Sequence, residues 1–250
     1  MNRIIRRTLL SAGYMVLAVI AVGCSDIRIG DVFGFRPGYI QTAGYSVKNL
    51  AIEYSVHGAG ERTIFILGGI HGDEQASVVL AKKLQEFIVN EQPGFLNETR
   101  VVIMANANPD GAKAGTRDNA NGVDLNRNFP TGNRINSAEF GQSGFSEPES
   151  AAIAKIIYEY EPDLIISVHQ PLACIDYDGD AEEVAELMAG ESGLPVKKLG
   201  AMPGSLGSYS SQMLSIPIIT FELPQGAETL EPLVLWELYK PAIVAAIEYK

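Results

Sequence analysis

His71 and Glu74 lie three residues apart in a glycine-rich segment that follows an apolar run and precedes a run with helical spacing. In α/β sheets, ligands gather where strands end, so both side chains can converge there on one cation. Imidazole nitrogens and carboxylate oxygens suit zinc, and a catalytic zinc site keeps three protein ligands. The best third ligand is His169, which ends the apolar run at residues 163–168. By itself, the His–Glu spacing is equally typical of a structural pair.

Few other side chains could complete such a site. The chain holds three histidines and two cysteines, so a cysteine-rich zinc module is excluded. The remaining histidine, His57, opens the sequence His-Gly-Ala-Gly between two β-rich runs. We expect a hairpin-like turn there and a solvated imidazole.

Three further segments strengthen the metal-site prediction. They are Asn108-Pro109-Asp110-Gly111, the run Thr116–Pro130 (TRDNANGVDLNRNFP) and Phe221-Glu222-Leu223-Pro224. The first follows a predicted strand and the last ends one. Residues 107–146, which contain two of the segments, show little periodicity, and loops this long in compact domains are usually functional.

The chain resembles the zinc metallocarboxypeptidases of the carboxypeptidase A type, and among them the murein peptide amidases, over residues 40–245. The resemblance rests on HGDE at 71–74, the run 117–130, HQPLACI at 169–175, PGSLGS at 203–208 and FELP at 221–224. It implies a peptidase or amidase with one zinc ion per chain. The implied substrate is a murein peptide with a free terminal carboxylate, cut between γ-D-glutamate and meso-diaminopimelate.

The resemblance implies that zinc is held by His71, Glu74 and His169. Glu222 matches the family's general acid/base, and Arg117 matches the arginine beside the scissile carbonyl. Zinc lowers the pKa of a bound water to about 7, so a neighbouring carboxylate can activate that water by taking its proton. The arginine would stabilise the developing oxyanion. The structural alternative for Glu222 is a surface acid at a strand or helix end, and that for Arg117 is a solvated loop residue.

The other predicted site residues would bind substrate. Asn126 and Arg127 match the family's pair that holds the substrate's terminal carboxylate, for which an arginine fork is suited. Asp176, with Asp178 nearby, could meet the side-chain ammonium group of diaminopimelate; the alternative is two turn residues. Ser205 lies in a glycine-rich segment that allows close backbone approach to the substrate, or it caps a helix. A structural alternative for Arg127 is an ion pair with the nearby Asp124.

Strand-like and helical runs alternate along the chain. Strands are predicted at residues 50–56, 63–67, 100–105, 163–168 and 217–222. Helices are predicted at residues 75–90, 181–192, 205–214 and 231–248, with another ending at Tyr160. Ser146 and Glu149 have the spacing of a capping box for that helix, and Pro148 suits its first turn. The alternation predicts one three-layer α/β domain, with a mixed, largely parallel twisted sheet and helices on both faces.

The first 24 residues resemble a lipoprotein signal. Three arginines precede an apolar run that ends in Gly23 and Cys24. We expect cleavage of residues 1–23, lipidation of Cys24, a tether over residues 24–45 and a catalytic domain over residues 46–250. The chain would be exported and anchored in a bacterial membrane facing the periplasm, in the outer membrane if one is present. A conventional cleavage or an uncleaved anchor helix are the alternatives.

The net charge argues against one class of partner. The formal charge of −11 becomes −14 once the three arginines of residues 1–23 are removed, which argues against nucleic acid as a partner.

Two functions other than a murein peptide amidase stay open. A zinc deacylase of the aspartoacylase and succinylglutamate-desuccinylase type shares the glycine-rich motif with His71 and Glu74 and is the second hypothesis. A non-catalytic muropeptide-binding lipoprotein is the third hypothesis, disfavoured because it would not need the catalytic residues.

Overall fold

The computed structural model describes residues 39–200 and 202–250. The predicted signal peptide, Cys24 and tether residues 24–38 lie outside the described residues. Residues 40–45 were expected to belong to the tether. They instead form strand β1 (Ile40–Tyr45), which pairs antiparallel with β2 (Ala51–His57). The folded domain therefore includes residues before residue 46.

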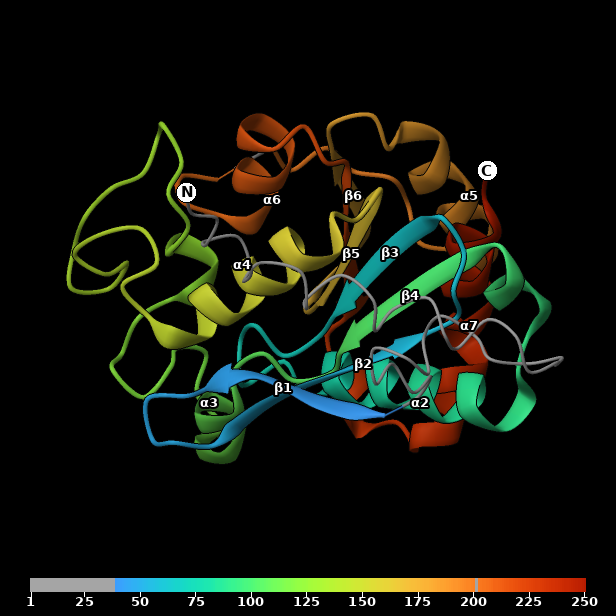
Figure 1. Cartoon of the computed structure of the whole chain (residues 1–250), viewed down its shortest axis with the longest axis horizontal. Coiled ribbons are helices and arrows are strands. Elements are labelled where there is room, and N and C mark those ends of the chain that lie inside the picture. The colour runs from blue at the N-terminus through green and yellow to red at the C-terminus, as the bar shows by residue number, and fades with distance from the viewer. Residues whose placement is uncertain (1–38, 201) are drawn as a thin grey trace, which may run out of the picture. The chain divides into compact units, whose positions relative to one another are not determined.

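Seven strands form one mixed sheet in the order β1-β2-β4-β3-β5-β7-β6 (Figure 1). The remaining strands are β3 (Arg62–Leu67), β4 (Thr99–Met104), β5 (Leu164–His169), β6 (Leu172–Asp178) and β7 (Ile218–Pro224). The four central strands, β4, β3, β5 and β7, run parallel, while β1, β2 and β6 join antiparallel at the edges. The predicted α/β class with a mixed sheet is confirmed.

Helices α2 (Gln75–Glu91), α5 (Glu182–Ser192) and α7 (Pro232–Glu248) cover one face of the sheet. Their apolar side chains pack on the strand residues that point toward them, such as Ile64 and Ile66. Because side chains alternate across a strand, Phe65 and Leu67 face the other side, where α4 (Pro148–Tyr160) lies. The short helices α3 (Pro109–Ala114) and α6 (Leu206–Ser208) belong to the loops. Among the described residues, no helix is long and apolar enough to cross a membrane.

The hairpin-like turn predicted after β2 is wrong, because β4 lies between β2 and β3 in the sheet. The glycines there serve close packing: a Cβ atom on Gly58 would lie 2.3 Å from the carbonyl oxygen of Thr99. His57 is accordingly the last residue of β2 and only 3% exposed, and Nε2 of its ring lies 2.8 Å from Oγ of Ser55. The expected solvated imidazole is a buried one.

The predicted capping box of α4 is also wrong. Glu147 occupies the N-cap position and makes no side-chain cap hydrogen bond, although Pro148 starts the helix as expected. The Ser146 hydroxyl donates to Glu147, and Glu149 accepts hydrogen bonds from the side chain of Asn119 and a backbone N–H. These side chains fix the long loop before α4 instead of capping the helix.

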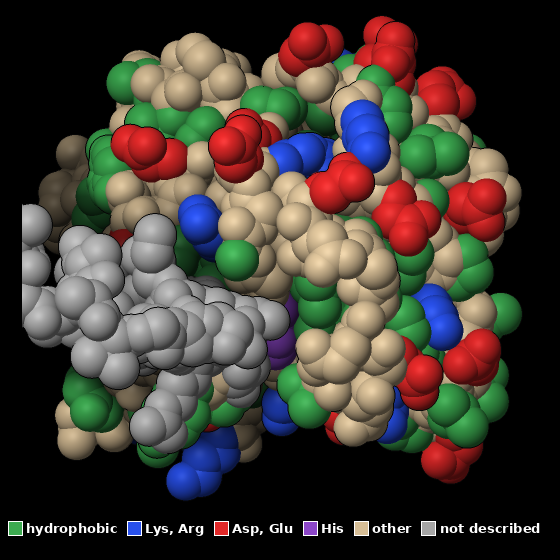
Figure 2. All heavy atoms as spheres, turned by 45° about the vertical axis from the view of Figure 1, so that its right-hand side comes forward, with side chains coloured by type: hydrophobic (Ala, Val, Ile, Leu, Met, Phe, Trp, Pro, Cys, Tyr) green, Lys and Arg blue, Asp and Glu red, His purple; other side chains and the backbone are tan. Residues whose placement is uncertain are grey.

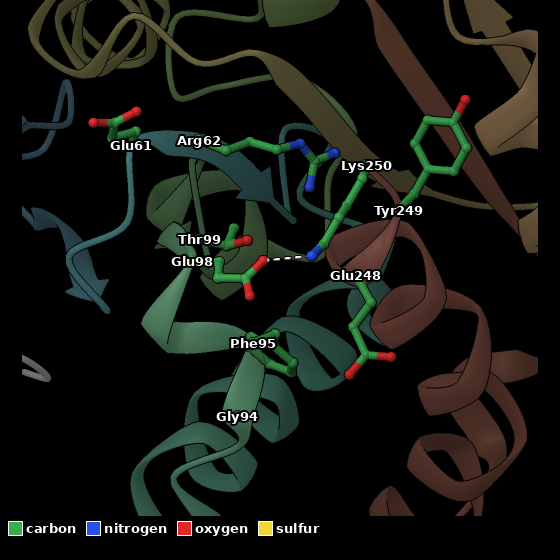
Figure 3. Close-up of a pocket in the computed structure, with 9 residues that line it drawn as sticks. All are labelled: Glu61, Arg62, Gly94, Phe95, Glu98, Thr99, Glu248, Tyr249 and Lys250. Atoms are coloured by element: carbon green, nitrogen blue, oxygen red, sulfur yellow. Dashed lines mark ion pairs between the residues drawn. The ribbon is translucent and has the colours of Figure 1, made fainter.

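A hollow of about 610 Å³ lies where β3 and β4 begin, beside the C-terminal end of α7 (Figure 3). Lys250 and Glu98 form an ion pair of 2.6 Å across it. The amino ends of parallel strands are not where α/β sheets collect ligands. The site-forming residues lie at the opposite, carboxyl ends.

Candidate metal centre and substrate pocket

The structure brings His71, Glu74 and His169 together at the carboxyl ends of β3 and β5, with one ligand atom from each within 4.8 Å of the others. Nδ1 of His71 lies 2.7 Å from Oε1 of Glu74, and Nδ1 of His169 lies 2.9 Å from Oε2. All three side chains are buried. Two imidazoles facing one carboxylate form a donor set that fits zinc.

Close backbone packing shapes the turn that carries His71 and Glu74. A Cβ atom on Gly72 would lie 2.1 Å from the backbone of Gly111, and the Gly72 N–H donates to the carbonyl of Arg117 at 3.1 Å. The turn therefore rests directly on α3 and on the segment that follows it. Position 72 must be glycine because any side chain would collide with Gly111. The hydrogen bond from Gly72 to the Arg117 carbonyl also holds Arg117 beside the candidate metal centre.

The ring nitrogens that face away from Glu74 are held by two further residues. Oδ1 of Asp124 lies 3.2 Å from Nε2 of His71, and Oγ of Ser167 lies 2.9 Å from Nε2 of His169. Such partners orient metal-binding imidazoles and select their tautomers. Neither residue was predicted to act at the site, although Asp124 lies inside the polar run that was singled out.

The charges around Glu74 favour its carboxylate form. Burial would raise its pKa, but His169 and His71 outweigh burial and hold the pKa below its ordinary range. The pKa of Asp124 is lowered in the same way, against burial, by His71 and by Arg117. An ionised Glu74 is the form that can ligate a cation.

Arg117 lies at the candidate metal centre. Its Nη1 is 3.4 Å from Oε1 of Glu74 and its Nε is 3.2 Å from Oδ2 of Asp124. Its side chain is 44% exposed, so one side of the guanidinium still faces the cavity. Among the described residues, the hydrogen-bonded arginine partner of Asp124 is Arg117, and not Arg127 as the structural alternative required.

Glu222 lies on β7 directly opposite His169 of β5, and its side chain is buried beside the candidate metal ligands. Oε2 of Glu222 accepts a hydrogen bond from the N–H of Leu172 at 3.3 Å. Burial raises the pKa of Glu222, while His169 opposes the rise. A carboxyl group with a raised pKa can take up and release a proton more readily near neutral pH.

Asn126 and Arg127 lie side by side on the cavity wall. Oδ1 of Asn126 accepts a hydrogen bond from the N–H of Leu206 at 2.9 Å, which leaves Nδ2 to donate elsewhere. Nη1 of Arg127 donates to the Asn126 carbonyl at 2.6 Å. Burial lowers the pKa of Arg127, whereas Asp124 favours its charged form. The pair presents amide and guanidinium donors to one cavity.

The cavity has a volume of about 350 Å³ and joins the metal centre to Asp176 and Asp178. Both acids lie within strand β6, which the sequence did not predict, so the turn alternative is wrong. Asp176 is 4% exposed, and its Oδ1 accepts a hydrogen bond from the N–H of Leu199 at 2.9 Å. Burial raises the pKa of both carboxyl groups. A Cβ atom on Gly207 would lie 2.6 Å from Oδ2 of Asp178, so the glycine makes room for that acid.

Ser205 lines the cavity, but its hydroxyl caps α6 by accepting a hydrogen bond from the N–H of Ser208 at 3.0 Å. The structural alternative for Ser205, a helix cap, is therefore confirmed. Its role in substrate binding stays a prediction. Three apolar residues missed by the sequence reasoning also line the cavity and are about half exposed: Leu172, Leu199 and Met202. On the face shown in Figure 2, outside the grey atoms, Lys and Arg form no continuous patch, in agreement with the negative net charge.

The chain is similar to known proteins in its sequence and in its fold. The family model for zinc carboxypeptidases matches residues 41–186. Murein peptide amidase A of Escherichia coli strain K12 is 38% identical over 184 residues, covering 66% of this chain and 73% of the relative. The corresponding protein of Vibrio campbellii is 33% identical over 178 residues, covering 64% and 68%.

Solved structures show the same fold. The murein-tripeptide amidase of Escherichia coli O157 superimposes with a TM-score of 0.69 at 30% identity, covering 84% of this chain and 93% of that chain. Carboxypeptidase A from Helicoverpa armigera has a TM-score of 0.69 at 20% identity, covering 84% of this chain and 68% of that chain. The second likeness concerns the fold alone.

Proposed function

The chain belongs to the zinc carboxypeptidase family, and from this membership we propose that it is a zinc-dependent murein peptide amidase. The bond cut is the one between γ-D-glutamate and meso-diaminopimelate. The observation that carries the proposal is the convergence of His71, Glu74 and His169 beside Glu222 and Arg117 in one cavity. Relatives with 38% and 33% identity bear the name murein peptide amidase A.

One zinc ion per chain would be held by His71, Glu74 and His169. The ion supplies Lewis acidity for a carbonyl oxygen and lowers the pKa of water to about 7. The fit rests on the donor set itself, because the two Nδ1 atoms and the carboxylate face one another and the carboxylate is held ionised.

Glu222 is the proton carrier in this mechanism. The Leu172 N–H donates to Oε2 and fixes the orientation of the carboxylate, which takes the proton of the attacking water. The same carboxyl group then gives that proton to the amine nitrogen of the leaving diaminopimelate. Its raised pKa suits both halves of this transfer.

Arg117 stabilises the negative oxygen that forms on the cleaved amide. Its Nε and Nη1 atoms are held by Asp124 and Glu74, and the remaining N–H groups of the guanidinium are free to donate to the substrate. A guanidinium fixed before the reaction begins need not reorganise as charge develops. Asp124 therefore orients both Arg117 and His71.

Asn126 and Arg127 bind the terminal carboxylate of the substrate. The Leu206 N–H fixes the orientation of the Asn126 amide and leaves Nδ2 as a donor, and Arg127 adds guanidinium donors in the same cavity. Carboxylate recognition by charge-assisted hydrogen bonds orients the scissile bond as well as adding affinity.

Asp176 and Asp178 bind the side-chain ammonium group of diaminopimelate. They lie in the same cavity as the carboxylate-binding pair, and Asp176 is almost fully buried. A buried carboxylate pays a desolvation cost that a cationic partner offsets. Gly207 lets the Asp178 carboxylate reach the cavity, because a Cβ atom at that position would lie 2.6 Å from Oδ2 of Asp178.

The sequence of residues 1–24 supports an exported protein that is lipid-anchored through Cys24 and faces the periplasm. The substrate would then be murein peptide outside the cytoplasm. Mass spectrometry of the membrane fraction tests this directly, since diacylglycerol on Cys24 is expected and an unmodified N-terminus further along would exclude the anchor.

The activity is tested by incubating zinc-loaded protein with L-Ala-γ-D-Glu-meso-diaminopimelate and, separately, with an N-acyl amino acid. Release of free diaminopimelate is expected. Turnover of the acyl amino acid alone would identify a deacylase. Tight binding of the tripeptide without turnover of either compound would identify a binding protein.

A further inference from the structure

Gln170, the residue after the proposed metal ligand His169, makes three hydrogen bonds to other parts of the chain. Its backbone N–H donates to Oε2 of Glu74 at 3.2 Å, and its side-chain carbonyl accepts from the N–H of Ala76 at 2.9 Å. Its side-chain amide donates to Oε2 of Glu228 at 2.7 Å. Gln170 is 8% exposed. It thus connects a metal ligand, the first turn of α2 and the turn Ala227–Thr229 that follows β7.

Helix α2 depends on this contact because it has no cap of its own. Glu74 occupies the N-cap position but makes no cap hydrogen bond, since its carboxylate faces the two histidines. The N–H of Ala76 is buried, and Gln170 supplies its acceptor. The same residue that contacts the Glu74 carboxylate therefore also fixes the helix that begins beside it.

Glu228 allows only one orientation of the Gln170 amide. A carboxylate can only accept hydrogen bonds and a backbone N–H can only donate. Nε2 must therefore face Glu228, and Oε1 must face Ala76. Reversing the amide would place two acceptors against each other at Glu228 and two donors against each other at Ala76.

We propose that Gln170 and Glu228 are positioning residues that hold Glu74 in place for metal binding, so that zinc affinity depends on their hydrogen bond. This role rests on the zinc ion of the proposed function. Residues that orient metal ligands from outside the ligand set typically change metal affinity 10–100-fold when they are substituted.

The first test measures the zinc dissociation constant of the full chain by competition with a chelator of known affinity. Gln170→Leu removes both side-chain hydrogen bonds and should raise the constant by about 10–100-fold. Gln225→Leu, an exposed glutamine in the loop after β7, is the matched control and should leave it unchanged. Circular dichroism of the metal-free proteins verifies that each variant is folded.

The second test exchanges the two partners. Gln170→Glu sets two carboxylates against each other and should weaken zinc binding at least as much as Gln170→Leu. The double variant Q170E/E228Q reverses donor and acceptor between the pair and leaves a carboxylate oxygen for Ala76. It should recover most of the lost affinity, which a general loss of stability would not do.

Two outcomes would overturn the role, and they differ from each other. A wild-type chain that binds no zinc removes the proposed function and this role with it. A wild-type chain that binds zinc, with Gln170→Leu and Gln170→Glu variants that bind it equally well, removes the positioning role alone and leaves the proposed function intact.

Discussion

Oδ1 of Asp124 lies 3.2 Å from Nε2 of His71, on the side of the imidazole ring away from Glu74. The two residues are 53 positions apart in the chain, and the long loop after α3 brings them together. Asp124 also holds Nε of Arg117 at 3.2 Å. One buried carboxylate thereby orients both the proposed metal ligand His71 and Arg117, the arginine proposed to contact the substrate.

We predict that Asp124→Asn raises the zinc dissociation constant by about 10–100-fold, because the uncharged amide holds the His71 ring less firmly. The rate per zinc-loaded molecule should also fall, since Arg117 loses an ionic partner. Asp73→Asn, an exposed neighbour of Glu74, is the control. Equal zinc affinity in the wild type and in Asp124→Asn would show that this contact is dispensable.

Glu222→Gln should leave zinc bound and lower kcat by about 10²–10⁴-fold, the usual contribution of general acid–base catalysis. The amide keeps the size of the side chain and the acceptor for the Leu172 N–H, but it cannot take a proton. Metal analysis of the purified variant is measured alongside the rate. Loss of zinc from Glu222→Gln would make Glu222 a ligand and contradict the assigned role.

Arg127→Ala should raise KM for peptides with a free terminal carboxylate, by about 10-fold or more for a lost hydrogen bond between charged groups. Peptides whose terminus is amidated should be affected much less. Arg100→Ala, whose side chain contacts Thr63 of β3 away from the cavity, serves as control. An equal loss on both peptide types would exclude Arg127 from carboxylate recognition.

Asp176→Asn should reduce the preference for diaminopimelate over 2-aminopimelate, which lacks the side-chain ammonium group. A reduction of about tenfold in the ratio of kcat/KM values is expected for one charge-assisted hydrogen bond. Asp180→Asn, exposed two residues beyond β6, is the matched control. A preference that survives in Asp176→Asn would place ammonium recognition elsewhere.

His57 should make the folded chain sensitive to acid. Burial lowers the pKa of His57 from 6.5 to about 4, so the unfolded chain binds the proton more readily between these values. Above pH 6.5, protonation of His57 takes nothing from the free energy of unfolding. As the pH falls toward 4, this free energy decreases, by about 3 kcal/mol in total once the pH is below both pKa values.

His57→Gln should lose less stability than the wild type between pH 6.5 and 4, because glutamine does not titrate. Urea unfolding of the metal-free proteins at several pH values measures the difference, since zinc release would add its own pH dependence. Parallel pH profiles for the two proteins would show that this imidazole is not the titrating group.

Much of the fold could be predicted because the signals are local. Helices expected at 75–90 and 181–192 appear as Gln75–Glu91 and Glu182–Ser192, the latter ending at Gly193 as predicted. Their apolar spacing and terminal residues lie within a few positions of one another. Strands β1 and β6 were missed because their own residues show no clear strand pattern. They are strands because each pairs with a neighbouring strand, β1 with β2 and β6 with β7.

The sequence by itself determined the donor chemistry of the site: two histidines, a glutamate after a glycine turn, and a second glutamate and an arginine in distinctive segments. Tertiary structure alone decided which groups support them. Asp124 reaches His71, Gln170 reaches Ala76 and Glu228, and Asp176 lies in the cavity wall instead of a turn. These contacts join residues far apart in the chain, and His57 is buried because β4 enters between its strand and the next. The types of side chain and their spacing are read from short stretches of sequence. The burial of a side chain and its hydrogen-bond partners depend on which strands and loops become neighbours in the fold.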